Sequence, residues 1–459
     1  MSKRSHDTAP AAAIVLAAGL GTRMKSTLPK VLHPLGGRPM LQHLLATLDT
    51  LGLDRCVVVT GAGQDAVAAA AQPHPTVEQA EQLGTGHAVL QAAPALEGFA
   101  GDVLILFGAD PLITSATMLR LLARRREADS PSVVVLGFRP EDPGLYGRLM
   151  VDADGQLIGI VEARDATPEQ LNVTLCNSGV MAIDGTRLFD LLSRVDNANA
   201  KGEYYLTDIV AVARADGLGC AVIEAEDAAE LTGIDTRADL ARAEAILQDR
   251  LRARAMDNGA NLVAPETVFL SHDTVLGRDV TVGPNVVFAP GVTVGDNVTI
   301  RPFCHLEGAS VADGAVVGPF ARLRPGAEVG SDAHVGNFVE IKNAALGRGA
   351  KANHLTYIGD ATVGDGANVG AGTITCNYDG FGKYRTEIGA GAFIGSNTAL
   401  VAPVTVGAGA IVGAGSVIAK NVAADALAVT RAAHDERDGW AAKFRARKSA
   451  ANKKKRGSD

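Results

Sequence analysis

A six-residue repeat fills most of the second half of this 459-residue chain and constrains its fold more than any other feature. From Leu276 to Ile341 an apolar side chain recurs at every sixth position, with one single-residue slip before Val311. The repeat resumes at Ile358 and runs to Ile418, and a glycine often follows the apolar residue. Short strands that turn after each hexad stack on one another, because one repeat cannot bury its apolar face alone. The pattern therefore predicts a parallel β-helix with three hexads in each coil.

One segment, 376–387, breaks the six-residue period. Its sequence, CNYDGFGKYRTE, is polar and contains aromatic residues. Such an insertion must leave the coil as a loop, and loops held on a rigid scaffold commonly carry function. We therefore expect this loop to belong to a site on the β-helix.

Residues 11–237 follow a different pattern, in which strand-like apolar runs alternate with amphipathic segments. Strands that alternate with helices indicate an α/β domain with a Rossmann-like, largely parallel sheet. Ligands of such domains bind at the carboxyl ends of the strands. The expected strands are 12–19, 56–61, 103–108 and 132–138, and the expected helices include Met40–Leu51 and Thr114–Arg126.

A segment without glycine or proline separates the two patterns. It places Leu240, Leu247 and Leu251 on one helical face. A helix stop of the Asn-Gly type ends it. The last residues of the chain are basic and poor in apolar side chains, which favours a solvated, mobile end. We predict an α/β domain over 12–237, a helical linker over 238–258, a β-helix over 259–440 and a basic tail over 441–459.

Composition excludes several classes of protein. The net charge of −8 argues against a nucleic-acid binder, whose footprint is basic. No apolar run approaches about 18 residues, so we expect no membrane span. Five cysteines are scattered without a CxxC pair, which indicates neither a disulfide framework nor a zinc site. We expect a cytoplasmic protein that acts on small molecules.

A glycine-rich turn follows the first expected strand, in the sequence LAAGLGTRM (16–24). Gly19 and Gly21 let the backbone approach a phosphate, and Arg23 adds a positive charge. The turn lacks the lysine of a Walker A loop and the third glycine of a dinucleotide fingerprint. Lys30, in the sequence LPKVL, adds a second cation six residues further on. These residues alone indicate only a phosphate-binding turn.

Together the two segments resemble the sugar-1-phosphate nucleotidylyltransferases, whose pattern is LxxGxGTRM followed by PK. The segments QAEQLGTGH (79–87), YGR (146–148), GIVE (159–162), NSG (177–179) and EYYLTD (203–208) extend the resemblance. With the hexapeptide half, the chain is similar over roughly residues 12–440 to the bifunctional N-acetylglucosamine-1-phosphate uridyltransferase/glucosamine-1-phosphate acetyltransferase family. That family makes UDP-N-acetylglucosamine for the cell envelope.

For the first domain the resemblance implies transfer of a uridyl group from UTP to N-acetylglucosamine 1-phosphate, with release of pyrophosphate. Positive charge and Mg²⁺ then neutralise the transition state. The matching positions place Arg23 and Lys30 on the phosphates, and Gln79, Gly84 and Thr85 on the uracil. The rest of the expected nucleotide and sugar site is Leu16, Ala17, Gly19, Gly147, Glu162, Asn177 and Thr207.

The expected metal ligands depart from the family pattern. The family has glycine, aspartate, any residue and proline, whereas this chain has Gly108-Ala109-Asp110-Pro111. In an extended backbone one step turns a side chain to the opposite face, so Asp110 is not a free substitute for the missing aspartate. The second ligand, an asparagine in the family, is Asp235 here, and this change keeps an oxygen ligand that suits Mg²⁺. We predict that Asp235 and Asp110 hold the metal and that uridyl transfer is retained.

Charged residues of the β-helix gather near one histidine. Arg324 and Lys342 are 18 residues apart, so they stack in adjacent coils at about 4.8 Å. Two cations this close form either a phosphate site or a surface pair relieved by Glu340. His354 follows in the sequence NHLTY, and a side chain with an ordinary pKa near 6.5 suits either general-base catalysis or a structural role.

The resemblance implies that the second domain transfers an acetyl group from acetyl-CoA to the amine of glucosamine 1-phosphate, with His354 as the base. The family's β-helix is left-handed and trimeric, with active sites at subunit boundaries, so we expect a homotrimer. Arg324, Lys342, Tyr357, Asn368 and Lys383 match phosphosugar positions. Ala371, Asn377, Tyr378, Ser396, Ala414 and Arg431 match acetyl-CoA positions.

Two alternatives remain open from the sequence. Ala109 favours an acetyltransferase whose uridyltransferase half is impaired. A nucleotidylyltransferase with a β-helix that serves only as a trimerising scaffold is the other alternative. The Arg324, Lys342 and His354 group argues against a pure scaffold, which needs no cations beside a histidine.

Overall fold

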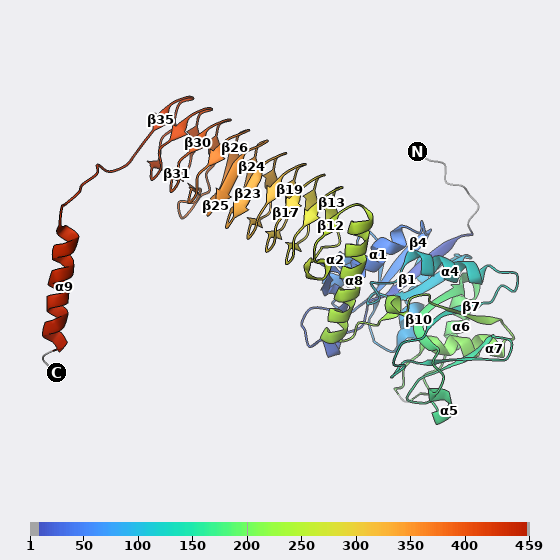
Figure 1. The fold of residues 1–459 in the computed structure, drawn as a ribbon. Coiled ribbons are helices and arrows are strands. Elements are labelled where there is room, and N and C mark those ends of the chain that lie inside the picture. The colour runs from blue at the N-terminus through green and yellow to red at the C-terminus, as the bar shows by residue number, and fades with distance from the viewer. Residues whose placement is uncertain (1–8, 200, 457–459) are drawn as a thin grey trace. The chain divides into compact units, whose positions relative to one another are not determined.

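The computed structural model describes residues 9–199 and 201–456. The chain forms two compact units (Figure 1). The first comprises the residues up to Arg254 together with Leu270–His272, and the second comprises Ala255–Phe269 and the residues from Asp273 onward. No helix among the described residues combines the length and the apolar character needed to cross a bilayer.

A nine-stranded sheet forms the centre of the first unit. Its main order is β11-β7-β10-β6-β1-β4-β5, with β8 attached to β10 and β9 attached to β8. The sheet is largely parallel, as predicted, but β10 runs antiparallel to both of its neighbours in that order. The strands are β1 (Ala11–Leu16), β4 (Arg55–Gly61), β5 (Thr76–Gln79), β6 (Asp102–Phe107), β7 (Val133–Phe138), β8 (Arg148–Val151), β9 (Leu157–Val161), β10 (Cys176–Asp184) and β11 (Cys220–Glu224).

Apolar side chains cover both faces of this sheet. In β1, Ile14 packs into one core cluster and Val15 into another, because successive side chains of a strand point to opposite faces. Strands buried on both faces are near-continuous apolar runs, which is how β1 was visible in the sequence. The α-helices of the unit are α1 (Met40–Asp49), α2 (Asp65–Ala70), α3 (Thr85–Leu90), α4 (Ser115–Arg125), α5 (Pro168–Leu171), α6 (Gly185–Ser193), α7 (Ile209–Ala215) and most of α8 (Arg237–Asp257), whose last residues belong to the second unit.

Short parallel strands build the second unit as a β-helix (Figure 1). Val282 pairs with Ile300 and Ile300 pairs with Val317, so a coil of 18 residues is followed by one of 17, as the slip in the repeat predicts. All three side chains are fully buried. Val369 pairs with Ile394, so this coil is longer because it contains the inserted loop. Strands used below are β21 (Arg322–Leu323), β23 (His334–Asn337), β24 (Glu340–Leu346), β25 (Lys351–His354), β26 (Tyr357–Val363), β27 (Asn368–Val369), β28 (Ile374–Cys376) and β29 (Thr386–Ile388), within a stack that extends from β12 (Asn261–Leu262) to β35 (Leu427–Ala428).

The basic tail is helical. Helix α9 (Trp440–Arg456) occupies most of the segment for which the sequence favoured a mobile end. Alanine, lysine and arginine are strong helix formers and dominate its composition, which explains the helix despite the lack of an apolar face. The rings of Trp440 and Phe444, one turn apart, stack with their centroids at 5.1 Å.

Candidate functional site

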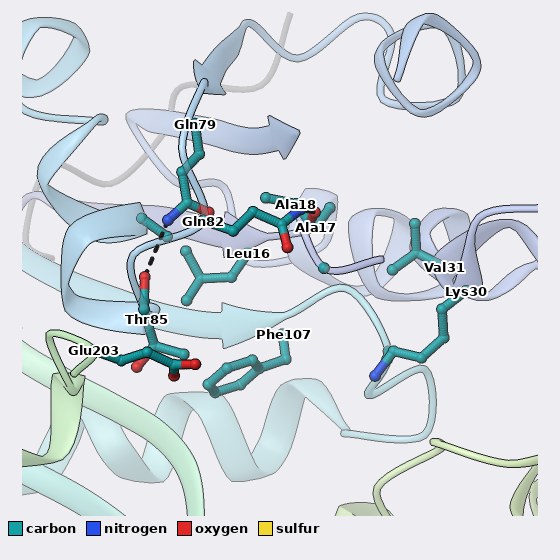
Figure 2. A pocket seen from close by; sticks show the side chains of 14 residues that line it. Leu16, Ala17, Ala18, Lys30, Val31, Gln79, Gln82, Thr85, Phe107 and Glu203 are labelled. Atoms are coloured by element: carbon teal, nitrogen blue, oxygen red, sulfur yellow. Dashed lines mark hydrogen bonds between the residues drawn. The ribbon is translucent and has the colours of Figure 1, made fainter. Parts of the chain in front are cut away.

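A pocket of about 280 Å³ opens in the first unit at the carboxyl ends of three strands. Leu16, Gln79 and Phe107, the last residues of β1, β5 and β6, line it (Figure 2). This is the edge at which the fold class predicts a ligand. Predicted nucleotide-site residues in its lining are Leu16, Ala17, Gly19, Lys30, Gln79, Gly84 and Thr85.

Other residues of the lining were not singled out from the sequence as nucleotide ligands. Figure 2 shows Lys30 and Glu203 at opposite ends of the pocket, with Gln82 between them. The Nε2 atom of Gln82 donates to the backbone oxygen of Ala18 at 2.7 Å. Both Gln82 and Glu203 lie inside segments that carry the family resemblance, so the motif contained their signal. The further lining residues are Ala18, Val31, Ala88, Phe107 and Ala109.

Glycine is required at two turns of the pocket. Gly84 has φ of 114°, and a Cβ atom there would lie 2.5 Å from the backbone oxygen of Tyr204. Gly21 has φ of 61°, and a Cβ atom there would lie 2.5 Å from Cβ of Lys30. A larger residue at either place would be strained and would push neighbouring backbone or side-chain atoms away. The glycine-rich turn therefore packs directly against Lys30.

Asp235 gathers two cations beside the pocket. Its Oδ1 atom lies 2.9 Å from Nη2 of Arg23 and 3.0 Å from Nζ of Lys30. Lys30 lines the pocket, whereas Arg23 does not and its side chain is 69% exposed. The structure thus brings the two predicted phosphate-binding cations together on one carboxylate.

The backbone turns at the point where this chain departs from the family pattern. Asp110 N donates to the backbone oxygen of Phe107 at 3.0 Å, so Ala109 sits in a turn and the extended geometry does not apply. Ala109 lines the pocket, and the buried Asp110 does not. Burial raises the pKa of Asp110 to about 7, with Lys30 lowering it and Asp235 raising it. The Asp110 carboxyl group is therefore close enough to Lys30 and Asp235 to share their field.

Three of the predicted sugar-site residues lie together outside this lining. A Cβ atom on Gly147 would lie 3.5 Å from Oε1 of Glu162 and 3.6 Å from Cβ of Asn177. Burial raises the pKa of Glu162, and Lys201 opposes the shift. Thr207 lies in the short 3-10 helix Leu206–Asp208, whose first backbone N–H donates to Oγ1 of Thr85 at 3.0 Å and ties this segment to the pocket wall.

In the second unit, a hydrogen bond fixes His354 at the end of β25. Its Nδ1 atom lies 2.7 Å from Oδ1 of Asn337, the residue paired with it in the preceding coil. An amide oxygen only accepts, so this assignment puts the proton on Nδ1 and leaves Nε2 as a base. The His354 side chain is exposed, so Nε2 is accessible.

The two stacked cations are adjacent, as predicted. Leu323 of β21 pairs with Ile341 of β24, which aligns the next residues, Arg324 and Lys342. Arg324 Nη1 lies 2.8 Å from Oε1 of Glu340, so the relief by a carboxylate that the sequence left open is present.

Positive charge nevertheless exceeds negative charge in this cluster. Lys342 Nζ lies 3.5 Å from Oδ2 of Asp360, and Arg322 shares Glu340 with Arg324. Lys342 lowers the pKa of Lys383 in the inserted loop, because the two ammonium groups are close. Four cations, Arg322, Arg324, Lys342 and Lys383, therefore face the carboxylates of Glu340 and Asp360 and a third, Glu307, which also acts on Arg324.

A corner of successive coils carries several predicted acetyl-CoA residues. The backbone oxygen of Ala371 accepts a hydrogen bond of 2.7 Å from Asn397 N in the next coil. The backbone oxygen of Ser396 accepts one of 2.8 Å from Gly415 N, which follows Ala414. The backbone oxygen of His354 accepts a 3.3 Å bond from the residue after Ala371. The Arg431 side chain lies beside Gly413 and Gly415, which flank Ala414, so that a Cβ atom on either glycine would come within 4 Å of it. These residues therefore form a line along successive coils, with His354 at one end and Arg431 at the other.

The inserted loop projects from the coil between β28 and β29. Asn377 Nδ2 donates to Oδ2 of Asp360, and Tyr378 Oη donates to the backbone oxygen of Gly380 at 2.7 Å. The loop closes where Tyr384 N donates to the backbone oxygen of Asn377 at 2.9 Å. Asn377 thus connects the loop to the carboxylate that binds Lys342.

Two predicted phosphosugar residues differ in their surroundings. Tyr357 of β26 pairs with Glu340, beside the cation cluster. Asn368 of β27 pairs with Lys351 and Phe393. It belongs to the same sheet as His354 and to a different sheet from Lys342 and from β21, the strand that precedes Arg324.

These sites and folds define a transferase with two catalytic parts. Residues 13–173 match the family model described as the MobA-like NTP transferase domain. Residues 273–308 and 385–420 match the model described as the bacterial transferase hexapeptide, in agreement with a left-handed β-helix.

Relatives match the chain over almost its whole length. Proteins named bifunctional protein GlmU are 64% identical in Paramagnetospirillum magneticum, 66% in Rhodospirillum rubrum and 60% in Rhizorhabdus wittichii. The matches cover 97%, 95% and 95% of this chain and 98%, 97% and 97% of the relatives. The chain belongs to the GlmU family. It is a bifunctional uridyltransferase and acetyltransferase of UDP-N-acetylglucosamine synthesis, as predicted, rather than either single-function alternative.

Proposed function

We propose that UTP binds in the pocket of the first unit with its phosphates on Lys30 and Arg23. The single observation that carries this proposal is the convergence of both cations on Asp235 at the pocket edge. The Nε2 atom of Gln79 already donates to the backbone oxygen of Gly84 at 3.1 Å. The amide oxygen of Gln79 then accepts the imide N–H of uracil, and Thr85 lies on the same wall.

The carboxylates beside Lys30 fit a Mg²⁺ ion. Asp110 and Asp235 raise each other's energy when both are ionised, and a divalent cation relieves that repulsion. Among the described residues no cluster of three or more histidine, cysteine or acidic side chains is arranged for a metal. Two carboxylates suffice, because Mg²⁺ commonly takes one or two of them together with phosphates and water. When bound, Mg²⁺ neutralises charge that develops on the phosphates.

The acceptor sugar binds at Gly147, Glu162, Asn177 and Thr207 in this proposal. Gly147 leaves room for the sugar ring beside Glu162 and Asn177, where a side chain would fill the space. Orientation by these residues lets a phosphate oxygen of N-acetylglucosamine 1-phosphate attack the α-phosphorus of UTP. The bond to the leaving pyrophosphate breaks as the new P–O bond forms, and Lys30 stabilises the charge.

In the second unit, His354 removes a proton from the ammonium group of glucosamine 1-phosphate. Arg324, Lys342 and Lys383 hold the phosphate, because these cations together with Arg322 outnumber the carboxylates of their cluster. The freed amine attacks the thioester carbonyl of acetyl-CoA, the thiolate of CoA leaves, and this thiolate takes up the second proton that the nitrogen loses as the amide forms. Nε2 of His354 keeps the proton until release.

Acetyl-CoA lies along the corner that carries Ala371, Ser396 and Ala414. Its thioester is at the His354 end and its nucleotide phosphates are at Arg431. A backbone N–H near Ala371 is available to the oxyanion of the tetrahedral intermediate. Asn377 and Tyr378 form the wall of the inserted loop, and Tyr357 and Asn368 complete the phosphosugar side.

An exposed aromatic stack supports the homotrimer. The rings of Phe303, Phe320 and Phe338 stack in successive coils with centroids 4.9 and 5.2 Å apart, yet each residue is about half exposed. Leu355, next to His354, is 62% exposed. A contiguous apolar stripe of this kind marks an interface, and a second copy of the chain covers it in the trimer. The substrates and the five free cysteines fit a cytoplasmic location.

The two half-reactions, assayed separately on the whole protein with and without Mg²⁺, test these assignments. Uridyl transfer should require Mg²⁺, and acetyl transfer should proceed in EDTA. Uridyl transfer at full rate without a divalent cation would contradict the metal site at Asp110 and Asp235.

A further inference from the structure

A second cavity of about 410 Å³ lies in the first unit, apart from the pocket for UTP. Its walls come from α1, from the connection that precedes α4, from α8 and from His272. All of these residues belong to the first compact unit. The volume is in the range of cavities that bind small molecules.

Arginines give this cavity its charge. Arg38, Arg250 and Arg254 line it, and none of the described residues in its lining is acidic. Arg250 is engaged, because Nη1 donates to the backbone oxygen of Leu112 at 2.7 Å and Nη2 lies 3.2 Å from Oδ2 of Asp227. The side chains of Arg38 and Arg254 have no hydrogen-bond or ion-pair partner within residues 9–199 and 201–456. Two guanidinium groups are thus left without a counter-charge.

Two histidines add hydrogen-bonding surface. His43 Nε2 lies 2.7 Å from the backbone oxygen of Leu35, and the rings of His43 and His272 meet edge-on at 5.9 Å. Burial lowers the pKa of His43, the hydrogen bond with the Leu35 carbonyl opposes this shift, and the neighbouring charges of Arg38 and His272 lower the pKa further. The arginines are the groups that recognise charge here.

Besides Asp227, the carboxylates of Glu230 and Glu244 accept hydrogen bonds from groups other than the three arginines. Glu230 accepts from Thr114 N at 3.1 Å and from Thr117 Oγ1 at 2.7 Å, at the start of α4. Glu244 accepts from Gly36 N at 2.8 Å and lies outside the lining. Neither Glu230 nor Glu244 forms an ion pair with Arg38 or Arg254, so the two guanidinium groups keep their donors for a ligand.

We propose that this cavity binds a small metabolite bearing a phosphate group, held by Arg38 and Arg254. Guanidinium groups form paired, charge-assisted hydrogen bonds with phosphate oxygens, which matches the unused donors. The hydroxyl group of Ser115 lies in the same lining and supplies a further donor, whereas the hydroxyls of Thr47 and Thr50 already donate to backbone oxygens at 3.1 and 2.7 Å. The ligand relieves the repulsion among the three arginines.

Thr50 offers a matched pair of variants for the test. It is exposed at the end of α1, so Thr50→Glu and Thr50→Gln both leave the core intact, and they differ only in charge. Titration calorimetry of the whole protein in EDTA would use inorganic pyrophosphate and ribose 5-phosphate, which present phosphate as a free anion and as an ester. Binding at the two active sites is common to all variants.

Thr50→Glu should weaken one site per chain by tenfold or more, and Thr50→Gln should bind as the wild type does. Arg254→Gln should weaken the same site roughly tenfold. Arg242→Gln, on the same helix and outside the lining, is its control. Binding of either probe at this site supports the proposal, and the probe that binds shows whether the site prefers a free phosphate anion or a phosphate ester. Equal isotherms for the wild type, Thr50→Glu and Arg254→Gln would overturn it, as would a change in oligomeric state without a change in binding, which would make the surface a contact between copies.

Discussion

At the scale of single residues, Asn337 decides which nitrogen of His354 is free to take a proton. Its amide oxygen lies 2.7 Å from Nδ1, so the imidazole presents Nε2 to the substrate. The hydrogen bond with Asn337 fixes both the tautomer and the ring orientation, whereas a ring free to rotate would present Nδ1 to the substrate for part of the time. Asn337 is therefore a positioning residue in the proposed acetyl transfer.

His354→Ala should lower acetyl transfer by about 10²-fold or more, the usual scale for loss of a general base. Uridyl transfer should stay near the wild-type rate, because that site lies in the other unit. His334→Ala, at an exposed position of the same β-helix, is the matched control. If both activities fell together in His354→Ala, the change would reflect unfolding and the catalytic assignment would fail.

Asp235→Ala should abolish Mg²⁺-dependent uridyl transfer and spare acetyl transfer. The change removes a proposed metal ligand and also the carboxylate that holds Arg23 and Lys30. Asp235→Asn keeps an oxygen ligand, so it should retain measurable activity. Full uridyl activity in Asp235→Ala would show that this carboxylate does not bind the metal.

Ala109→Asp tests whether the family's ligand position is still usable. Ala109 lines the pocket proposed for UTP, so a carboxylate at this position would lie at its wall. We expect a lower Mg²⁺ concentration for half-maximal uridyl transfer. An unchanged or higher requirement would show that Asp110 already supplies what the metal needs.

The sequence identified the pocket residues whose types carry the motif, such as Lys30 and Gln79. It could not settle Asp110, because the argument from an extended backbone failed where Asp110 N closes a turn onto Phe107. Burial of Asp110 and its proximity to Asp235 arise from contacts distant in sequence. Such contacts leave no local pattern.

At the scale of elements, the inserted loop is separable from the coil that carries it. Tyr384 N donates to the backbone oxygen of Asn377, so the two ends of the projecting part already meet. Excision of residues 378–383 should therefore leave thermal unfolding nearly unchanged and lower acetyl transfer at least tenfold, through loss of Lys383. Lys383→Arg in the intact loop keeps the charge and is the control. A wild-type rate of acetyl transfer in the protein that lacks residues 378–383 would show that the loop does not belong to the acetyltransferase site.

Periodicity made the β-helix the most predictable element. Each coil repeats one burial pattern, so Val282, Ile300 and Val317 were recognisable as core residues without any long-range information. The antiparallel strand β10 and the helix α9 were not foreseen. The direction of β10 depends on its neighbours in the sheet, and α9 rests on backbone propensity with no apolar stripe to reveal it.

At the scale of the whole molecule, the Phe303, Phe320 and Phe338 stack should control assembly. In light scattering, Phe320→Asp should convert the proposed trimer to monomers, and acetyl transfer should fall. Aspartate tolerates the φ of 56° at this position better than phenylalanine does, so the coil itself should keep its stability. Phe320→Leu, which stays apolar, should remain trimeric. A trimeric Phe320→Asp variant would place the subunit contact on another face.

Because the coils stack evenly, distances along the second unit increase in equal steps, one for each coil. In the proposed complex, the line from His354 through Ala371, Ser396 and Ala414 to Arg431 advances by about 4.8 Å with each coil. The spacing between the reacting end of the acyl donor and its nucleotide anchor is therefore counted in whole coils. A longer or shorter acyl donor would therefore be matched by the gain or loss of a whole coil of 17 or 18 residues. A side-chain substitution could not change this spacing by a fraction of a coil.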